Sequence, residues 1–573
     1  MSHSNASIGK LSRALSTRLN GVSTPADIYS LAYLARASQK AGKISGAKEA
    51  IELASNGDND VTALLENAFN DIVPAITIEE LINTVAAFDE EALDAYLEHG
   101  PIAQNIFDRE FETPGGVVRL VLAVLDIKPG DRVINLGSGQ GNFLEAAARK
   151  CPNAELAGIE INSDALATAK MRSRATGSKI SYVCEDMFRF YESNIRNNPV
   201  DKAFSNYPLG LKTKMLPKTS DYIEKVLKGQ DQYRRPLSSD WVFNRLLVDS
   251  LKKDGTAVAI MTNGACFNGT DKSVREYFVK NGFIRAIVSL PQGVFAPYSS
   301  IMTSLIILCA GGSKGIRFVD ATDLGTNDRR SCSIDGAAIE TILERLGTDS
   351  EKSAFKTADE IASHDFDLFA WRCLEKEIEV PNGVELGSVA SIARGAGVRA
   401  AELDALVCEE DTGLSYLNLG NISDGCIDDD LPNLSVLDPK LEKYCIDNGD
   451  VLISKTGAPF KVAVAEVPQD RKVLANGNLY VLKVDREKID PYYLAAFFSS
   501  PTGKELLARQ AVGTAIPNMP IRALSTIKVP LENAERQKAV ADAYLAKTDE
   551  IKVLKLRLAR ARQEITDLFD EER

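Results

Sequence analysis

The amino-acid sequence predicts an α/β fold built around a doubly wound, mostly parallel sheet, with a helical domain before it and a β-rich domain and a long helix after it. Three observations support this prediction. Strand-like and helix-like segments alternate from about Phe107 to Gly311, which requires a sheet covered on both faces. One strand, Arg132–Leu136, runs into a Gly-rich turn and a helix. From Val384 the alternation gives way to short strands, Gly turns and polar loops.

The bulk composition is that of a globular protein with several domains. A chain of 573 residues is too long for a single core. Its apolar runs have strand length and its first residues form no apolar leader, so we expect no membrane span, no secretory signal and a cytoplasmic location. The nine cysteines include no Cys-x-x-Cys pair and the three histidines lie away from the motifs below, so no metal site is expected. The net charge of −13 argues mildly against nucleic acid, although the local field matters more.

Residues 1–104 are predicted to form a helical domain. Ala26–Gln39 and Val61–Phe69 carry apolar residues at helical spacing, and acidic residues dominate Glu79–Glu98. The pattern contains no recognisable chemistry. A docking or oligomerisation bundle is therefore the default interpretation.

Residues 105–375 hold the alternating elements. The predicted strands are Arg132–Leu136, Glu155–Ile161, Ile180–Cys184, Lys202–Ser205, Thr256–Met261, Ile284–Leu290 and Ser304–Leu308. The predicted helices between them include Asn142–Lys150, Ser163–Arg174 and Asp240–Lys252. Residues 312–380 continue this pattern into a linker.

The Gly-rich turn after the first strand indicates a cofactor site. Gly137, Gly139 and Gly141 let the backbone approach a ligand that a Cβ atom would exclude. The turn also joins a strand to a helix, as nucleotide-binding turns do. A turn of this kind alone is weak evidence, because it fits nicotinamide dehydrogenases too.

Two acidic residues at the ends of the next two strands sharpen this prediction. Glu160 is placed where a carboxylate can bind ribose hydroxyls, and Asp186 where one can accept from an adenine amino group. Acids at strand ends are also common without any ligand, so a purely structural role for both stays open.

A short loop, Asn206-Tyr207-Pro208, follows the fourth predicted strand. The Asn side-chain oxygen and the next backbone carbonyl can accept both hydrogens of an exocyclic amino group. That would turn the nitrogen lone pair toward an incoming group, a gain from orientation more than from acid–base chemistry. A base in a duplex must first be flipped out to reach such a loop. The alternative is a turn with an incidental Asn-x-Pro.

Taken in order, these motifs resemble those of an N6-adenine DNA methyltransferase of the type I restriction–modification M-subunit family. Phe111–Pro114 resembles the motif ahead of the family's cofactor site, and Val133–Leu144 resembles its S-adenosylmethionine (SAM) motif. Ser205–Gly210 resembles its Asn-Pro-Pro-aromatic loop, and Ile287–Phe295 its later Leu-Pro-x-Gly-x-Phe element. The order of the elements is specific, whereas each element alone is not.

The resemblance implies a SAM-dependent methyltransferase domain over residues 105–375 that acts on double-stranded DNA. It implies a catalytic loop of Asn206, Tyr207 and Pro208, in which the proline fixes the loop. The residues that it assigns to the cofactor are Thr113, Pro114, Asn135, Gly137, Gly139, Gly141, Glu160 and Asp186.

The sequence departs from the family pattern at three positions. Asn135 stands where the family usually has Asp, Tyr207 where it has the first Pro, and Leu209 where an aromatic ring would stack on the flipped adenine. Loss of that stack could cost roughly 1–3 kcal/mol of base binding. The Tyr207 ring is one source of a displaced aromatic face. An impaired descendant that still binds DNA and SAM is therefore the second hypothesis, and a nicotinamide dehydrogenase a remote third.

Residues 384–573 resemble one half of a type I specificity subunit, so the whole chain resembles a fused M and half-S. In this interpretation residues 384–532 form a target-recognition domain and residues 533–573 a spacer helix. Loops of the recognition domain would approach DNA while basic residues position its backbone. Lys212 and Lys214, in a basic stretch after the Asn206 loop, are candidate DNA contacts with a solvated face as the alternative. The further candidates, each on a turn-like segment, are Arg394, Arg399, Lys455 and Asn518.

The last forty residues are predicted to form one long helix that Asn533 caps. Apolar residues follow at alternating spacings of three and four, which is a heptad seam. Its members are Val540, Tyr544, Ile551, Leu554, Leu558, Ala561, Ile565 and Leu568. Packing on its own domain is one interpretation. A homodimer with antiparallel helices, which would read two inverted half-sites, is the other. No nuclease motif is visible in the chain, so restriction would need a separate subunit.

Overall fold

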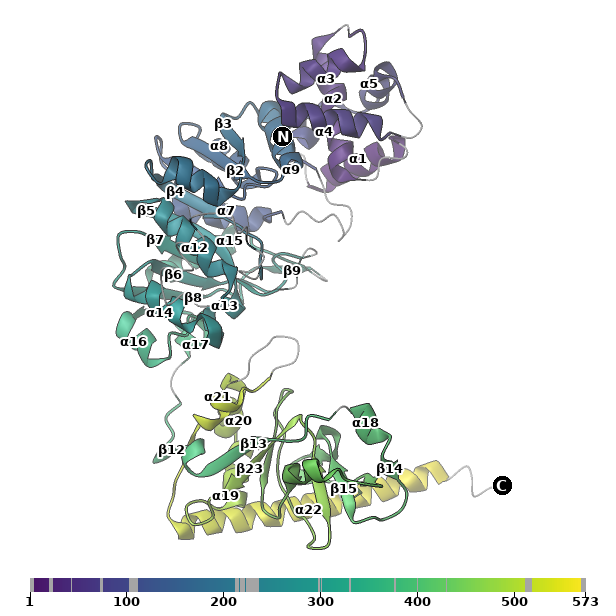
Figure 1. The fold of residues 1–573 in the computed structure, drawn as a ribbon, viewed down its shortest axis with the longest axis vertical. Helices are drawn as coiled ribbons and strands as arrows, with labels where there is room; N and C mark the ends of the chain where they lie inside the picture. Colours follow the sequence, from purple (N-terminus) through teal and green to yellow (C-terminus); the bar gives the residue numbers. More distant parts are fainter. Residues whose placement is uncertain are drawn as a thin grey trace. The chain divides into compact units, whose positions relative to one another are not determined.

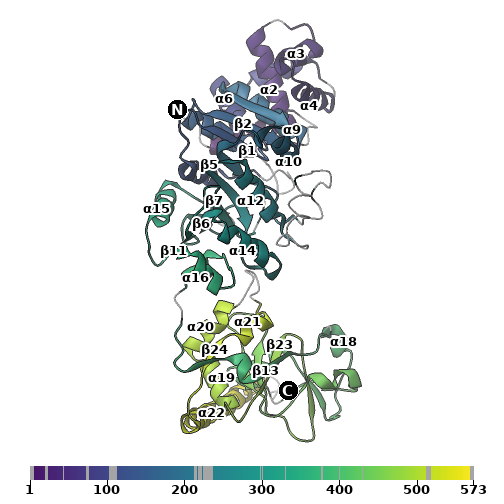
Figure 2. The same cartoon turned by 60° about the vertical axis from the view of Figure 1, so that its left-hand side comes forward.

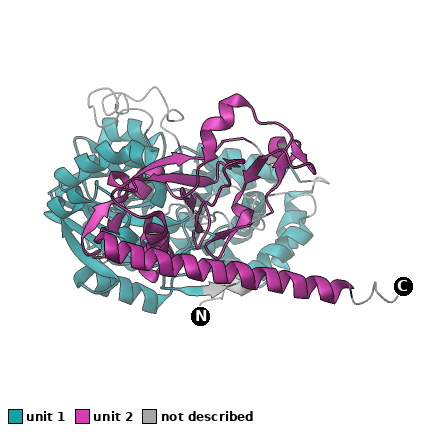
Figure 3. Cartoon of the chain, turned by 90° about the horizontal axis from the view of Figure 1, so that it is seen from below, with its two compact units in different colours: residues 1–375 teal, residues 376–573 magenta. Residues whose placement is uncertain are grey.

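The computed structural model divides the chain into two compact units, residues 1–375 and residues 376–573, which are described separately below (Figures 1 and 3). The structure describes residues 5–19, 24–42, 44–72, 76–101, 112–211, 216, 222, 237–296, 299, 301–328, 331–375, 378–398, 400–428, 430–510 and 518–567.

Unit 1 is built on a nine-stranded sheet with the order β11-β8-β6-β7-β5-β4-β1-β2-β3. The strands are β1 (Arg132–Leu136), β2 (Glu155–Glu160), β3 (Ile180–Cys184), β4 (Val200–Ser205), β5 (Leu251–Thr262), β6 (Ile284–Ser289), β7 (Thr303–Cys309), β8 (Gly315–Asp320) and β11 (Ser353–Thr357). A small hairpin of β9 (Thr326–Asp328) and β10 (Ser331–Ser333) lies apart from this sheet. Every predicted strand of this region has a counterpart.

The sheet is mixed rather than wholly parallel. Strand β7 is antiparallel to both of its neighbours, β5 and β6, and β11 is antiparallel to β8. The strands around the predicted cofactor turn, β1 to β5, pair in parallel. The dinucleotide-binding order 3-2-1-4-5-6 contains no reversed strand between the fifth and sixth, so this topology disfavours the dehydrogenase hypothesis.

Helices cover both faces of the sheet because alternate strand residues point to opposite sides. Along β5, Ala257 and Ala259 belong to the core under α12 and α14, whereas Val258 and Ile260 belong to the core under α7, α8 and α15. Figure 2 shows α12 lying across the strands. The described helices of this sheet region, taken over both faces, are α7 (Gly115–Leu125), α8 (Asn142–Lys150), α9 (Ser163–Thr176), α10 (Met187–Phe190), α12 (Ser239–Ser250), α13 (Asn263–Phe267), α14 (Lys272–Lys280), α15 (Gly336–Gly347), α16 (Ala358–Ser363) and α17 (Ala370–Leu374).

The N-terminal residues form the expected helical bundle, and the bundle packs on helix α9. Its helices are α1 (Asn5–Arg18), α2 (Pro25–Ala41), α3 (Ala47–Ser55), α4 (Asn59–Asn70), α5 (Ile78–Ala86) and α6 (Glu90–His99). Ala167 and Met171 of α9 are buried in the same apolar cluster as the bundle's own core. Lys170 adds ion pairs of 3.0 and 2.7 Å to Asp58 and Asp60.

Arg172, also on α9, joins the bundle to the Gly-rich turn. Its Nε donates to the carbonyl of Glu98 at 2.9 Å, close to the end of α6. Its Nη1 donates to the carbonyl of Gln140 at 3.3 Å and bonds to the side chain of Asn142. Arg172 as a whole residue is 5 % exposed. The bundle and the turn therefore share one buried cation.

Unit 2 is rich in short strands, as the texture of its sequence predicts. Its sheets have the orders β13-β23-β20-β21, β14-β18-β15-β22-β19, β12-β24 and β16-β17. The strands are β12 (Gly383–Glu385), β13 (Ala390–Arg394), β14 (Val407–Cys408), β15 (Leu414–Leu417), β16 (Ile422–Ser423), β17 (Cys426–Ile427), β18 (Asn433–Leu434), β19 (Cys445–Ile446), β20 (Val451–Ser454), β21 (Val462–Val464), β22 (Lys472–Ala475), β23 (Leu479–Val484) and β24 (Lys528–Pro530). Its shorter helices are α18 (Ala400–Asp404), α19 (Pro491–Ser499), α20 (Pro501–Gln510) and α21 (Ile521–Ser525).

The long C-terminal helix, α22 (Ala534–Asp567), begins where the sequence predicts. Asn533 Oδ1 accepts the backbone N–H of Arg536 at 2.9 Å, which caps the helix. The first half of the helix packs on α19, and its last turns project beyond the rest of unit 2 (Figure 3).

The predicted seam of α22 is only partly exposed. Val540 and Tyr544 pack against the core of unit 2 itself. Leu554, Leu558 and Ile565 are 54, 52 and 66 % exposed. The first half of the helix therefore packs on its own domain, and the homodimer stays a prediction for the exposed half. Leu568 lies outside the described residues.

Candidate functional site

The three glycines of the predicted cofactor turn all adopt positive φ angles, of 74° at Gly137, 50° at Gly139 and 82° at Gly141. Side chains other than glycine are disfavoured in this region. The N–H groups of Gly137 and Ser138 both donate to the carbonyl of Ile159, which fixes the start of the turn against β2.

The glycines differ in what surrounds them. A Cβ atom at Gly141 would lie 2.4 Å from the Tyr182 hydroxyl, so this glycine is required for packing. A Cβ at Gly137 would lie 3.5 Å from Met187 Cε. At Gly139, no described atom lies within 4 Å of the place that a Cβ atom would take. Gly139 therefore faces open space of the kind that a ligand would occupy.

Glu160 is bonded to both sides of this space. Its Oε2 accepts the N–H of Gly139 at 2.8 Å, and its Oε1 accepts the N–H groups of Ile161 and Asn162, both at 2.9 Å. The carboxylate thus connects the turn after β1 to the loop after β2. Oε1 already accepts two N–H groups, whereas Oε2 has a further lone pair that could accept from a ligand hydroxyl.

Asp186 lies after β3 and caps the short helix α10. Its Oδ1 accepts the N–H groups of Phe188 and Arg189 at 3.0 and 3.1 Å. Within the described part of the chain, Oδ2 has no hydrogen bond. The carboxylate is thereby held in one orientation while one oxygen remains for a ligand.

Two residues beside the turn were missed by sequence reasoning. The Ser138 side chain is 93 % buried, and its Oγ has no hydrogen-bond partner among the described residues. Ile161, directly after Glu160, is 66 % exposed. The turn therefore offers an unpaired hydroxyl and an apolar surface in addition to its two carboxylates. The position of Ile161 after the strand-end acid was the available signal.

The strand that leads to the Asn206 loop is tied to β1 by two side chains. Asn135 is 2 % exposed, and its Nδ2 donates to the carbonyl of Phe204 at 3.1 Å. The Ser205 hydroxyl donates to the carbonyl of Leu136 at 2.6 Å. An aspartate at position 135 could not donate in this way when ionised. The cofactor role of Asn135 stays a prediction, while its observed bond supports the loop.

Asn206 lies beside the segment that precedes α7. Its Nδ2 donates to Thr113 Oγ1 at 3.0 Å. Among the described residues no group donates to Asn206 Oδ1. This bond across 93 positions orients the amide so that its oxygen is available as an acceptor. Pro114 follows Thr113 at the start of α7.

Tyr207 does not supply the displaced aromatic face that the sequence allowed. Its side chain is 1 % exposed and turns into the core, where the ring stacks on Phe243 with centroids 4.8 Å apart. Its hydroxyl donates to Asn244 Oδ1 at 3.0 Å. Leu209 is half-buried and packs on the opposite core, whereas Pro208 is exposed. In the core the Tyr207 ring is buried and its hydroxyl has a hydrogen-bond acceptor. The inward rotamer is favoured because it provides both.

Asp240, at the start of α12, is a buried acid that sequence reasoning did not identify. Its Oδ1 accepts the N–H of Thr262 at 3.0 Å, and its Oδ2 has no partner in the described structure. Burial raises the pKa of Asp240 to about 6, against the opposing effect of the Thr262 hydrogen bonds. No periodicity or motif marks this residue, because its neighbours come from distant strands.

Three of the candidate DNA contacts in unit 2 lie at the same end of one sheet. Arg394 ends β13 and donates through Nε to the carbonyl of Gly477 at 2.7 Å. Lys455 follows β20, and Thr456 beside it pairs with Asn518. The loops that carry these side chains therefore converge. That they contact DNA stays a prediction. Lys212, Lys214 and Arg399 lie outside the described residues.

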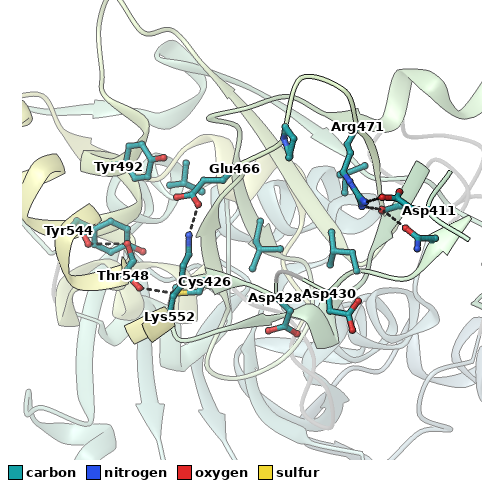
Figure 4. Close-up of a pocket in the computed structure, with 18 residues that line it drawn as sticks. Asp411, Cys426, Asp428, Asp430, Glu466, Arg471, Tyr492, Tyr544, Thr548 and Lys552 are labelled. Atoms are coloured by element: carbon teal, nitrogen blue, oxygen red, sulfur yellow. Dashed lines mark hydrogen bonds and ion pairs between the residues drawn. The ribbon is translucent and has the colours of Figure 1, made fainter. Parts of the chain in front are cut away.

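A cavity of about 290 Å³ lies elsewhere in unit 2, between the short strands and α22 (Figure 4). Arg471 pairs with Asp411 at 2.6 Å and Lys552 pairs with Glu466, so both lining cations are neutralised. Asp428 and Asp430 add further negative charge. The local field would repel phosphates, so this cavity is disfavoured as a DNA-binding surface.

The described residues contain no group of three or more His, Cys, Asp and Glu side chains placed to hold a metal ion. In the same part of the chain, no helix has both the length and the apolar character needed to cross a membrane.

Comparison with known proteins finds similarity over the region that contains the candidate site. Residues 102–379 match the family model described as N-6 DNA Methylase. The type I restriction enzyme EcoEI methylase subunit of Escherichia coli is 23 % identical over 282 residues, which cover 44 % of this chain and 54 % of that protein. The MjaVII methylase subunit of Methanocaldococcus jannaschii is 26 % identical over 216 residues, 34 % of this chain and 35 % of that protein.

These matches show that this part of the chain is similar to methylase subunits of type I restriction enzymes. The matched segments span about half and about a third of the two relatives. Among solved structures, the DrdV–DNA complex covers 88 % of this chain and 70 % of that chain, with a TM-score of 0.50 and 12 % sequence identity. At that identity the likeness concerns the fold.

Proposed function

We propose that the protein is a site-specific DNA methyltransferase that transfers a methyl group from SAM to the N6 atom of adenine. The observation that carries this proposal is the geometry of Asn206. Its amide nitrogen is engaged by Thr113 while its oxygen is left as an acceptor. This oxygen and the carbonyl of Tyr207 would each accept one hydrogen of a flipped adenine's amino group.

The residues around the Gly-rich turn fit SAM. The open position over Gly139 would admit the ligand, and the Glu160 carboxylate beside it would bind ribose hydroxyls. Asp186 Oδ2 would accept from the adenine amino group, Ile161 would pack on its ring, and Ser138 would find a partner for its hydroxyl. When bound, SAM supplies an activated methyl group.

The contribution of the protein to the transfer is orientation. The two acceptors turn the lone pair of the target nitrogen toward the methyl donor, because both N–H bonds point to the loop. No side chain of the loop has to take the proton during attack. The gain comes from holding the reacting atoms in an aligned, close approach.

We further propose that residues 384–532 recognise the DNA sequence and that the exposed half of α22 pairs with a second copy. The convergence of Arg394, Lys455 and Asn518 supports the first idea. The exposed Leu554, Leu558 and Ile565 support the second. The chain would then act as a fusion of an M and a half-S subunit. A homodimer would be sufficient for modification, and restriction would require a separate subunit.

One observation favours the alternative, a protein that binds DNA and SAM but transfers methyl groups poorly. With Tyr207 turned into one core and Leu209 packed against the core on the opposite face of the sheet, the loop presents no aromatic ring to a flipped base. Base binding would be weaker by roughly 1–3 kcal/mol if no other ring compensates.

The test is methyl transfer from labelled SAM to duplexes of varied sequence, with binding of SAM and of DNA measured separately. The expected result is label on adenine N6 in duplexes that share one bipartite sequence. Asn206→Ala should abolish transfer and leave SAM binding intact. If both ligands bind and no duplex is labelled, the enzymatic proposal is wrong and the alternative is favoured.

A further inference from the structure

The Tyr207 side chain is held in the core by two separate interactions. Its ring stacks on Phe243 at an interplanar angle of 17°, and its hydroxyl donates to Asn244 Oδ1 at 3.0 Å. Both partners belong to the same turn of α12. Asn244 is fully buried, and its Nδ2 faces the sulfur of Met261 at 3.9 Å. The tyrosine therefore fills a site that has a matching acceptor.

The pairing is specific because neither group can be satisfied by water. A buried hydroxyl or amide without a partner costs about 1–3 kcal/mol. Burial also raises the pKa of Tyr207 well above its ordinary value, so the hydroxyl remains a donor. A proline at position 207 would leave Asn244 Oδ1 unpaired and the space of the ring empty.

The loop is fixed on three sides when this contact is included. Ser205 bonds to Leu136 on β1, Asn206 bonds to Thr113, and Tyr207 reaches α12. In such a loop the Tyr207 side chain points inward, and only its backbone carbonyl is needed at the site. Proline restricts a loop through its fixed φ angle. Here side-chain contacts can supply the restriction instead.

We propose that Tyr207 and Asn244 form an anchor that holds the Asn206–Pro208 loop in its working position, so that the tyrosine replaces the missing proline rather than disabling the loop. Tyr207 is then a positioning residue through its side chain. This inference rests on the proposed methyl transfer for its kinetic consequence. The anchor itself concerns the loop alone and is measured independently.

The experiment compares Tyr207→Phe with Tyr29→Phe in the full-length protein. Tyr29 is a matched control, because it is also fully buried and its hydroxyl donates to the carbonyl of Leu97 at 2.7 Å, far from the loop. Hydrogen exchange of the amides of residues 205–210, SAM affinity and kcat are measured for each. Tyr207→Phe should raise exchange in this segment and lower kcat roughly tenfold with SAM affinity unchanged. Tyr29→Phe should change neither the exchange of residues 205–210 nor kcat, although both variants lose thermal stability.

A second variant separates the anchor from a general loss of packing. Tyr207→Pro should lower kcat further, whereas an impaired loop repaired by proline would gain activity. Unchanged exchange in Tyr207→Phe, or activity gained in Tyr207→Pro, would overturn the anchor. If the wild-type protein methylates no DNA, the proposed function fails, and the exchange comparison alone decides whether the anchor exists.

Discussion

At the scale of single residues, the Gly-rich turn contains one glycine that packing requires, Gly141, and one that faces open space, Gly139. Gly139→Ala places its Cβ in open space, so the variant should fold with a loss of about 1 kcal/mol for the left-handed backbone. If SAM binds as proposed, its affinity should fall at least tenfold, because the added methyl group would occupy space that the proposal assigns to SAM. Calorimetry measures the affinity and thermal unfolding the stability.

Two other glycines serve as controls for this prediction. Gly130→Ala has the same left-handed strain and the same open space at the opposite end of β1, and it should bind SAM normally. Gly141→Ala should lose stability instead, because of the Tyr182 hydroxyl 2.4 Å away. Equal SAM affinity in the Gly139 and Gly130 variants would disprove the assignment.

Glu160 is predicted to act through both of its oxygens. Glu160→Gln keeps the size of the side chain but replaces one acceptor by a donor, so the N–H of Gly139 or those of residues 161 and 162 lose their partner. SAM affinity should fall roughly tenfold. Glu155→Gln, at the exposed opposite end of β2, should leave it unchanged. Calorimetry that finds the two variants equal would contradict the assigned role.

Asp240 predicts a pH dependence of stability. Its folded-state pKa of about 6 lies above the unfolded value of about 3.9, so folding takes up a proton between these values. Its contribution is fully present below about pH 4 and is lost as the pH rises through 6, by an amount on the order of 3 kcal/mol. The free energy of unfolding of Asp240→Asn, relative to the wild type, should therefore rise between pH 4 and pH 7. A pH-independent difference in denaturant titrations would show that Asp240 is ionised throughout.

Residue-level chemistry was predictable where it depends on neighbours in sequence and not where it depends on distant partners. The glycines, Glu160 and Asn206 are marked by their place after a strand. The inward turn of Tyr207 depends on Asn244, and the orientation of Asn206 depends on Thr113, 93 positions earlier. Such pairs exist only once the sheet has formed, so a single sequence carries no sign of them.

At the scale of elements, α22 shows the limit of pattern analysis. Its heptad spacing identified the helix and Asn533 its start, because both depend on local rules. The spacing could not tell which half packs on unit 2, since an apolar stripe fits either partner. Boundaries were also less certain where register is irregular: β5 extends back to Leu251, which pairs with Val200 ahead of a register shift.

The exposed half of α22 predicts an assembly. Replacing Leu554 and Leu558 by Asp should give monomers and abolish recognition of paired half-sites, because two charges cannot be buried between helices. Replacing Val553 and Leu556 by Asp is the matched control, as these side chains are 48 and 62 % exposed and lie off the seam. Light scattering with and without DNA measures the assembly. A wild-type monomer under both conditions at micromolar concentration would defeat the model.

At the scale of the whole molecule, the division near residue 375 predicts a division of labour. A chain that ends near residue 380 retains the whole of unit 1 and should bind SAM like the full-length protein. It should lose sequence-specific DNA binding, because the converging loops of Arg394, Lys455 and Asn518 are absent. Competition binding with specific and scrambled duplexes measures the effect. Selection of the same DNA sequence by the shortened chain would refute the division.

The buried guanidinium of Arg172 makes the N-terminal bundle and the cofactor turn energetically dependent on each other. The Arg172 side chain donates hydrogen bonds both to Glu98 in the bundle and to Gln140 in the turn. If the bundle detaches and Arg172 moves, the turn loses this hydrogen bond as well. Thermodynamic linkage is reciprocal: whatever tightens the turn must tighten the bundle by the same free energy. A small molecule bound at Gly139 would therefore slow the proteolysis of residues 5–101, and residues that carry no chemistry of their own would report whether the methyl donor is bound.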